Sequence, residues 1–235
     1  MNLKNKVVIV TGASAGIGEA IALKLAGSGC QLALVARTTS KLEDVAEKCV
    51  KAGATKALVY PLDISDTSLI SQTVSQIESD FWGIDILINN AGIWQKMMQL
   101  DEVKKDMIDP IIAINLSWVI HMTHSVLSIL RNRPEAAIVN IVSQSWVVAQ
   151  GGQSIYTATK FWIRGFTDVL KWDLKWSNVR VAWVYQAGTN TSMFASTGET
   201  MPIENFTDPN DLANVISYML SVPPKIWMHE VRVTY

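Results

Sequence analysis

A short apolar run near the N-terminus leads directly into a glycine-rich turn, and this junction limits the fold more than any other stretch. Residues 7–10 predict a buried strand, residues 12–18 carry glycines at the spacing G-x-x-x-G-x-G, and residues 19–25 have a helical pattern. Glycines let the backbone approach a pyrophosphate, whose charge meets the helix N-terminus. A glycine cluster alone could be only a turn, but its place between the first strand and the first helix favours a phosphate-binding site.

Strand and helix patterns alternate along the rest of the chain. Further strands are predicted over residues 31–36, 56–62, 84–88, 136–143, 180–185 and 229–233. Helices are predicted over residues 39–51, 66–81, 110–130, 154–176 and 209–220. Asp109-Pro110 predicts the N-cap and first residue of the long third helix of that series. This alternation predicts one α/β domain over residues 1–235, with seven mostly parallel strands and helices on both faces.

Composition excludes several classes of function. The 235 residues carry a formal net charge of −1 and a pI near 6.3, which gives no electrostatic case for nucleic acid or an anionic membrane. No stretch approaches a membrane span, since even residues 111–120 are interrupted by Asn115 and Ser117. Cys30 and Cys49 fit a reducing cytosol and predict a cytoplasmic location. With three scattered histidines they form no metal-ligand pattern, so we expect no metal site.

Arg37 follows the predicted second strand at once. In a dinucleotide site an acidic residue here holds the ribose 2′-hydroxyl, whereas an arginine accommodates a 2′-phosphate. Neither Ala36 nor Arg37 is acidic, which favours NADP and leaves NAD possible. The alternative is that Arg37 is a solvated loop charge.

Polar residues stand where predicted strands end. Asn89-Asn90-Ala91-Gly92 follows the fourth strand, and Ser143 ends the fifth. Amides and a glycine at this edge suit the ligand crevice of an open α/β sheet. Asn115 lies among apolar neighbours in the long helix, and a buried asparagine needs partners. It is either a local structural bridge or a site residue.

Tyr156 and Lys160 lie four residues apart in a helical pattern and therefore share one helix face. A nearby ammonium group favours the phenolate and is expected to lower the tyrosine pKa. Such a tyrosine can exchange a proton with a carbonyl or alcohol oxygen. The pair alone occurs by chance on many exposed helices.

In their order along the chain, these motifs resemble those of the short-chain dehydrogenase/reductase family. The resemblance covers Lys6 to about Val233, and Ser143 stands 13 residues before Tyr156, as is typical of that family. It rests on Thr11-Gly12-x-x-x-Gly16-x-Gly18, Asp63 after the third strand, Asn89-Asn90-Ala91-Gly92, Asn115, Ser143 and Tyr156-x-x-x-Lys160. It implies a Rossmann-type, doubly wound fold and an oxidoreductase using NADP(H) or NAD(H).

The resemblance also implies residue roles. Tyr156 would be the general acid/base, Lys160 would lower its pKa and bind the nicotinamide ribose, and Ser143 would stabilise charge on the substrate oxygen. Asn115 would position a water that links Lys160 to solvent. The other implied cofactor contacts are Gly12, Ser14, Ala15, Gly16, Ile17, Gly18, Arg37, Asp63, Ile64, Asn90, Ala91, Gly92, Gly188, Thr189 and Thr191.

Two positions depart from the family pattern. Ala187-Gly188 replaces the usual Pro-Gly after the sixth strand, and alanine stiffens a turn less than proline does. We therefore expect a more mobile nicotinamide loop. Ala15 stands where NADP-preferring members often carry a second basic residue, which leaves Arg37 as the main support for NADP.

The substrate is expected to be a hydrophobic ketone or aldehyde, reduced reversibly to an alcohol. The implied pocket is rich in apolar and aromatic side chains, as small-molecule pockets usually are. Its members are Trp94, Gln144, Trp146, Val148, Gln150, Tyr185, Met193 and Phe194. Several tryptophans could instead only pack against neighbours. The substrate loop, about residues 186–208, includes a segment at 192–206 that is short for a lid and suggests an open cleft.

Two other functions stay open: an NAD-dependent alcohol dehydrogenase of the same family, and a non-catalytic NADP-binding sensor or scaffold. The catalytic set is complete, which favours an enzyme. A homodimer or homotetramer is expected through the helices at 110–130 and 154–176. Trp118, Phe161, Trp162 and Trp172 are candidate contacts there, and core packing explains each of them equally well.

Overall fold

A single sheet organises the chain, in a computed structural model that describes residues 1–64, 66–146, 150–223 and 225–234. Among these residues the sheet has seven strands in the order β3-β2-β1-β4-β5-β6-β7, and every neighbouring pair is parallel. The strands are β1 (Val7–Thr11), β2 (Gln31–Ala36), β3 (Lys56–Pro61), β4 (Ile86–Asn89), β5 (Ala136–Ser143), β6 (Val179–Gln186) and β7 (Glu230–Val233). The predicted doubly wound α/β fold is confirmed.

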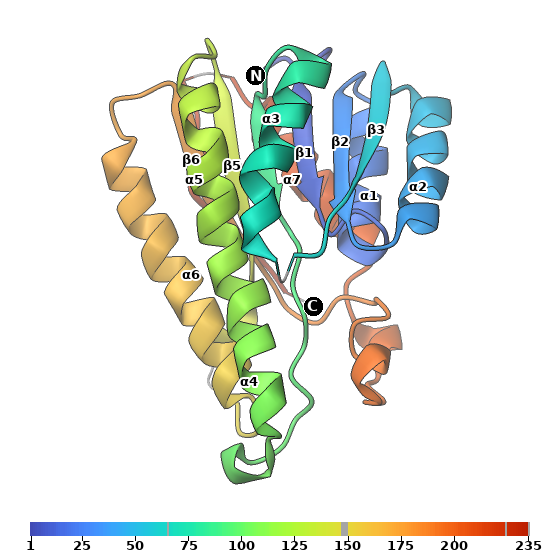
Figure 1. Ribbon diagram of the computed structural model, residues 1–235, viewed down its shortest axis with the longest axis vertical. Coiled ribbons are helices and arrows are strands. Elements are labelled where there is room, and N and C mark those ends of the chain that lie inside the picture. Colours follow the sequence, from blue (N-terminus) through green and yellow to red (C-terminus); the bar gives the residue numbers. More distant parts are fainter. Residues whose placement is uncertain (65, 147–149, 224, 235) are drawn as a thin grey trace.

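Helices cover both faces of the sheet (Figure 1). α1 (Gly16–Ala26), α2 (Thr39–Ala52) and α7 (Pro209–Ser221) pack on one face, and α3 (Ile70–Phe81), α5 (Trp118–Arg131) and α6 (Ser154–Asp173) pack on the other. Successive strand side chains point to opposite faces, so Val8 and Val10 enter one core while Val7 and Ile9 enter the other. Burial on both faces explains why β1, β2, β4 and β5 are largely apolar without alternation, whereas the edge strand β7 alternates charged and apolar residues.

The long helix before β5 begins earlier than Asp109-Pro110 predicts. α4 (Lys105–Ile112) starts at Lys105 and contains Pro110, so the predicted helix start is wrong. Pro110 has no N–H to donate to the carbonyl of Asp106, four residues earlier. Asp106 lies in the exposed first turn, where water can bond that carbonyl instead. A π-helical turn over Ala113–Ser117 then joins α4 to α5.

By length and composition alone, the continuous helical stretch Lys105–Arg131 could cross a membrane. This differs from the expectation that Asn115 and Ser117 break the apolar run, because both residues stay within the helical stretch. Trp118, Met122 and Val126 on its α5 part are buried against the sheet. Core helices of α/β proteins pass the same test.

Two special positions lie at the amino end of the sheet, away from the carboxyl ends of the strands. Asp85 is fully buried before β4 and pairs with Lys6 at 3.2 Å and with Arg133 at 2.8 Å. Trp82 closes α3 in the left-handed conformation, with φ of 62°, and is 89% exposed. Left-handed backbone is strained for any residue with a Cβ.

Candidate active site

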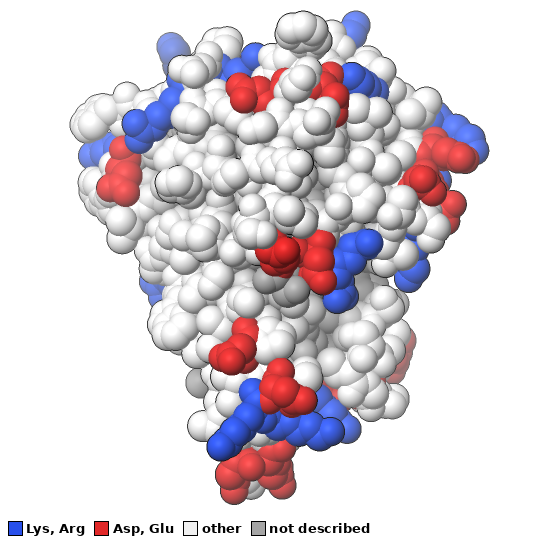
Figure 2. Space-filling model, viewed as in Figure 1, with Lys and Arg blue, Asp and Glu red and all other residues white. Residues whose placement is uncertain are grey.

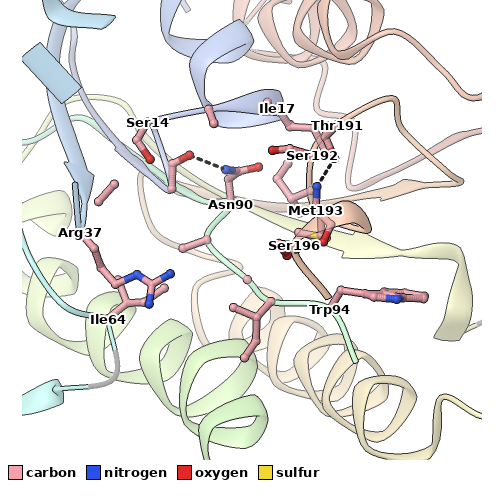
Figure 3. A pocket seen from close by; sticks show the side chains of 18 of the residues that line it. Ser14, Ile17, Arg37, Ile64, Asn90, Trp94, Thr191, Ser192, Met193 and Ser196 are labelled. Carbon is pink, nitrogen blue, oxygen red and sulfur yellow. Dashed lines mark hydrogen bonds between the residues drawn. The ribbon is translucent and has the colours of Figure 1, made fainter. Parts of the chain in front are cut away.

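An elongated cavity of about 320 Å³ opens at the carboxyl ends of the strands, and a second cavity of about 290 Å³ adjoins it. Both are lined by Ile17, Trp94 and Tyr156. Trp94 and Arg37 lie toward opposite ends of the first cavity, with Asn90 between them (Figure 3). Ligands in open α/β sheets bind at this edge.

The glycine turn forms the floor of the first cavity. Gly12 has φ of +66°, and a Cβ there would lie 3.0 Å from the Cα of Ala91. A Cβ on Gly18 would lie 2.2 Å from the carbonyl oxygen of Gly12, so only glycine allows α1 to approach the turn this closely. Gly18 is therefore a packing residue, and it does not itself line the cavity.

Asn90 holds the turn to the end of β4. Its side-chain Nδ2 donates to the carbonyl of Thr11 at 2.9 Å, and the Thr11 hydroxyl accepts the backbone N–H groups of Asn90 and Ala91 at 3.0 and 3.1 Å. Asn89 points elsewhere, donating to Asn140 at 2.9 Å and to Thr123 at 3.2 Å in the core. Of the two amides, Asn90 belongs to the cavity and Asn89 to the packing beneath it.

One end of the cavity is cationic. Arg37, Thr38, Lys41 and Ile64 line it, and the Arg37 side chain lies beside Ile64 in Figure 3. Lys41 was missed by the sequence reasoning, although its place one helical turn after Arg37, at the start of α2, could have indicated it. Asp63 is exposed and is not among the lining residues.

Ser143, Tyr156 and Lys160 come together at the other end. Tyr156 is 5% exposed and hydrogen-bonds with Ser143, while Lys160 Nζ lies 5.4 Å from the centroid of the Tyr156 ring. Burial raises the pKa of Tyr156 to about 12, against the opposing effect of the Ser143 hydrogen bond. Burial lowers the pKa of Lys160 to about 8. The expected lowering of the tyrosine pKa by Lys160 is thus not found in the protein alone, because burial disfavours both charged forms.

Gln95 fixes the start of the helix that carries Tyr156. Its side chain is 2% exposed, and Oε1 accepts the backbone N–H groups of Ile155 at 3.0 Å and Tyr156 at 2.9 Å. No side chain at the adjoining N-cap position, Gln153, bonds these groups. Gln95 therefore caps α6 from a distant segment and sets the position of Tyr156.

Asn115 is a bridge to the strand end above it. Its Oδ1 accepts the N–H of Ile93 at 2.8 Å, and its Nδ2 donates to the Ile93 carbonyl at 2.9 Å. A Cβ on Gly92 would lie 3.2 Å from Asn115 Oδ1 and 3.7 Å from Lys160 Nζ, so Gly92 allows the three to meet. Asn115 lies beneath the cavity and is not among its lining residues.

The second cavity joins an aromatic wall to a row of amides. Trp94, Phe194 and Phe206 form the wall, with Phe194 5.0 Å from Trp94 and 5.7 Å from Phe206 between ring centroids. A hydrogen-bonded chain runs from Ser143 through Ser145 and Gln153 to Gln150. The other lining residues are Ile17, Gln144, Tyr156, Gln186, Ala187, Gly188, Thr189, Thr191, Met193 and Met201.

One predicted pocket residue, Tyr185, does not line this cavity, and the side chain of Trp146 is not among those that the structure describes. Tyr185 is 2% exposed and packs on Trp183, with ring centroids 4.9 Å apart, so it is not among the lining residues. Trp146 ends a short turn at Gln144–Trp146. Val148 lies outside the described residues.

Ala187 has a hydrogen bond that the usual proline could not make. Its N–H donates to the carbonyl of Val233 at 2.9 Å and extends the ladder between β6 and β7. Proline has no N–H. The alanine therefore ties the base of the loop to the sheet, which counters the mobility expected from losing proline.

The part of the chain that the structure describes contains no group of three or more His, Cys, Asp or Glu side chains placed to hold a metal ion. Cys30 and Cys49 are both free and buried. Burial raises the pKa of both thiols to about 12. Neither is suited to act as a thiolate nucleophile.

Comparison with known proteins matches residues 6–202 to the family model for short chain dehydrogenases. An uncharacterized oxidoreductase of Listeria innocua is 29% identical, over 99% of this chain and 97% of its own length. A metagenomic short-chain oxidoreductase, solved in complex with NADP, has a TM-score of 0.85 and 28% identity, with 100% of both chains covered. An NADH-dependent reductase responsible for alginate metabolism shares the fold at a TM-score of 0.86 and 24% identity, over 98% of this chain and 96% of its own.

Proposed function

The chain belongs to the short chain dehydrogenase family of oxidoreductases, and we propose that it is an NADP(H)-dependent enzyme that reduces a hydrophobic ketone or aldehyde to an alcohol. The observation that carries this proposal is one continuous cavity. It has Arg37 at one end and Trp94 at the other, with Tyr156 beside Trp94 and Lys160 beside Tyr156, and Lys41 also lines it.

The residues present fit a phosphorylated dinucleotide. Gly12 and Gly16 line the first cavity at the N-terminus of α1, where backbone N–H groups and the helix dipole favour an anion such as a pyrophosphate. Arg37 and Lys41 line the cavity together with Thr38 and would bind the 2′-phosphate of the adenosine ribose. The NADP bound by the metagenomic relative supports the same assignment. The remaining cofactor contacts are proposed at Ser14, Ala15, Ile17, Ile64, Asn90, Ala91, Gly92, Gly188, Thr189 and Thr191.

The cofactor supplies the hydride, and the protein supplies position and a proton. Tyr156 holds its proton at neutral pH because burial raises its pKa to about 12, so it is ready to donate to a carbonyl oxygen. Ser143 donates its hydroxyl hydrogen to Ser145 at 3.1 Å, and rotation about its Cβ–Oγ bond redirects that hydrogen to the same substrate oxygen. Protonated Lys160 stabilises negative charge left on Tyr156.

The second cavity indicates the kind of substrate. Its aromatic wall favours an apolar substituent on the carbonyl, and the amides of Gln150 and Gln186 can bind a neutral polar group. None of the lining residues that the structure describes is charged. A substrate with a free carboxylate or phosphate would therefore lose its hydration without gaining an ion pair.

We also propose a homodimer or homotetramer that buries the outer face of α6. Phe161, Trp162 and Trp172 there are 43%, 54% and 71% exposed, whereas Trp118 is fully buried and cannot be a contact. Figure 2 shows a broad area without charged side chains over α5 and its surroundings. Exposed large apolar side chains such as the three on α6 mark subunit contacts.

The test is NADPH and NADH binding and oxidation by the purified protein, across ketones and aldehydes that differ in size and charge. Arg37→Asp and Lys41→Ala should each weaken NADPH binding about tenfold and spare NADH. Tyr156→Phe should bind NADPH normally and abolish turnover.

Each alternative has its own result. If the Arg37 and Lys41 variants lose affinity for NADPH and NADH equally, or lose none for either, the 2′-phosphate site is refuted. If the unaltered protein binds NADH more tightly than NADPH, an NAD-dependent alcohol dehydrogenase is favoured. Tight NADPH binding with no turnover on a broad panel would favour a non-catalytic sensor.

A further inference from the structure

The segment 192–206, which follows β6, forms a side of both cavities. Ser192, Met193 and Ser196 line the first cavity, and Figure 3 places them at the end where Trp94 lies, away from Arg37. Phe194, Met201 and Phe206 line the second cavity. A ligand bound in either cavity at this end would therefore contact this segment.

The base of the segment is fixed to the fold. The N–H of Asn190 donates to the carbonyl of Thr207 at 2.9 Å, and the N–H of Thr207 donates to the carbonyl of Gly188 at 3.0 Å. The bonds of Ser196, Thr197 and Gly198 return to residues 192–195 of the same segment. Such a loop moves as a unit about its base unless its far part is held.

Glu199 holds that far part. Its Oε1 accepts the backbone N–H of Met97 at 2.8 Å, and its Oε2 accepts the indole N–H of Trp94. These donors lie 102 and 105 residues earlier in the chain, on the segment that follows β4. One carboxylate therefore connects the loop to the opposite side of the site with two charge-assisted hydrogen bonds.

Trp94 transmits this contact to the reacting end of the site. The ring is 6% exposed and packs edge-on against Tyr156, with centroids 4.7 Å apart and planes at 62°. On another side it meets Phe194 at 5.0 Å and 75°. An indole has a single N–H donor, so the bond to Glu199 selects one orientation of the ring above Tyr156.

We propose that Glu199 is a positioning residue that latches the segment 192–206 to Trp94 and Met97, and so retains the cofactor and fixes the wall of the substrate cavity. The role of cofactor retention rests on the proposed function. The latch itself does not, because its contacts are made in the protein alone.

The first experiment measures amide hydrogen exchange without ligand in Glu199→Ala, Glu199→Gln and the matched control Glu204→Ala. Glu204 lies in the same segment, carries the same charge and is exposed. Exchange over residues 192–206 and at Met97 should rise about tenfold in Glu199→Ala and stay unchanged in Glu204→Ala. Glu199→Gln should be intermediate, because an amide oxygen can accept from one donor while its NH₂ group cannot accept from the other.

The second experiment follows NADPH dissociation by stopped-flow fluorescence. We expect about a tenfold faster rate in Glu199→Ala and a smaller increase in Trp94→Phe. Combining the two should give no increase beyond Glu199→Ala, which already removes the bond that Trp94→Phe removes. The Glu204→Ala rate should equal that of the unaltered protein.

Unchanged exchange in Glu199→Ala would overturn the latch, as would effects of Glu199→Ala and Trp94→Phe that simply add. Faster exchange with unaltered NADPH dissociation would overturn the part in cofactor retention. Failure of the unaltered protein to bind NADPH would count against the proposed function alone, while the exchange experiment would still decide whether Glu199 holds the loop.

Discussion

Loss of the proton on Lys160 should weaken NADPH binding as the pH rises above 8. Burial lowers the pKa of Lys160 to about 8, so the ammonium form predominates at pH 7 and the neutral form at pH 9. A polyanionic cofactor nearby favours the ammonium and raises this pKa in the complex. Binding at pH 8 should therefore take up roughly half a proton per site.

The size of the effect follows from that pKa. If only the protonated form binds well, the competent fraction falls from roughly 90% at pH 7 to roughly 10% at pH 9, which weakens binding about tenfold, or about 1.4 kcal/mol. Tyr156 adds no slope in this range, since its pKa is about 12. The Lys160→Met variant should bind more weakly at pH 7 and lose the pH dependence.

Fluorescence titration of NADPH at several pH values measures the affinity, and calorimetry in buffers of different ionisation enthalpy measures proton uptake. A tenfold weakening that persists in Lys160→Met would refute the reasoning, because another group would then be titrating. A flat profile in the unaltered protein would refute it equally, since a lysine pKa near 8 requires a slope.

Three further predictions concern stability and assembly. Asp85→Ala should destabilise the protein by about 2–4 kcal/mol in urea unfolding, because Lys6 and Arg133 lose their buried partner; an unchanged midpoint would contradict this. Trp82→Gly should stabilise the protein by about 0.5–1 kcal/mol, since glycine tolerates φ of 62° and the exposed indole contributes little packing. A loss of stability would show that the indole ring makes a stabilising contact. Trp172→Glu should lower the molar mass of the oligomer measured by light scattering. An unchanged mass would show that the interface does not include Trp172.

The parts of the site that sequence predicted are those carried by local patterns. The glycine turn, Arg37 after a strand and the Tyr156–Lys160 pair are each short in sequence, and each lines the cavity in the structure. Lys41 is also local, but it lies in the first turn of α2 and not at the end of β2, where the rule for a 2′-phosphate applies.

Long-range contacts were out of reach for a physical reason. Gln95 caps a helix about 60 residues later, and Glu199 binds an indole 105 residues earlier. Neither residue has a periodic or motif signature, since each acts through a single side chain placed by the tertiary fold. Pro110 gave the opposite error. The local rule places a proline in the first turn of a helix, but α4 already begins at Lys105, before Pro110.

The π-helical turn at Ala113–Ser117 has a consequence for how this scaffold can diverge. The wider turn holds one more residue than an α-helical turn, and each residue turns the helix by about 100°. The extra residue therefore rotates α4 relative to α5, so the two helices direct their buried side chains to different parts of the protein. α5 packs into the large core, whereas Ile111 of α4 packs with Val103 and Ile155 in a small cluster beside the start of α6. Substitutions in α4 can thus change the packing around Ile155, the residue before Tyr156, without touching the contacts of α5 in the large core.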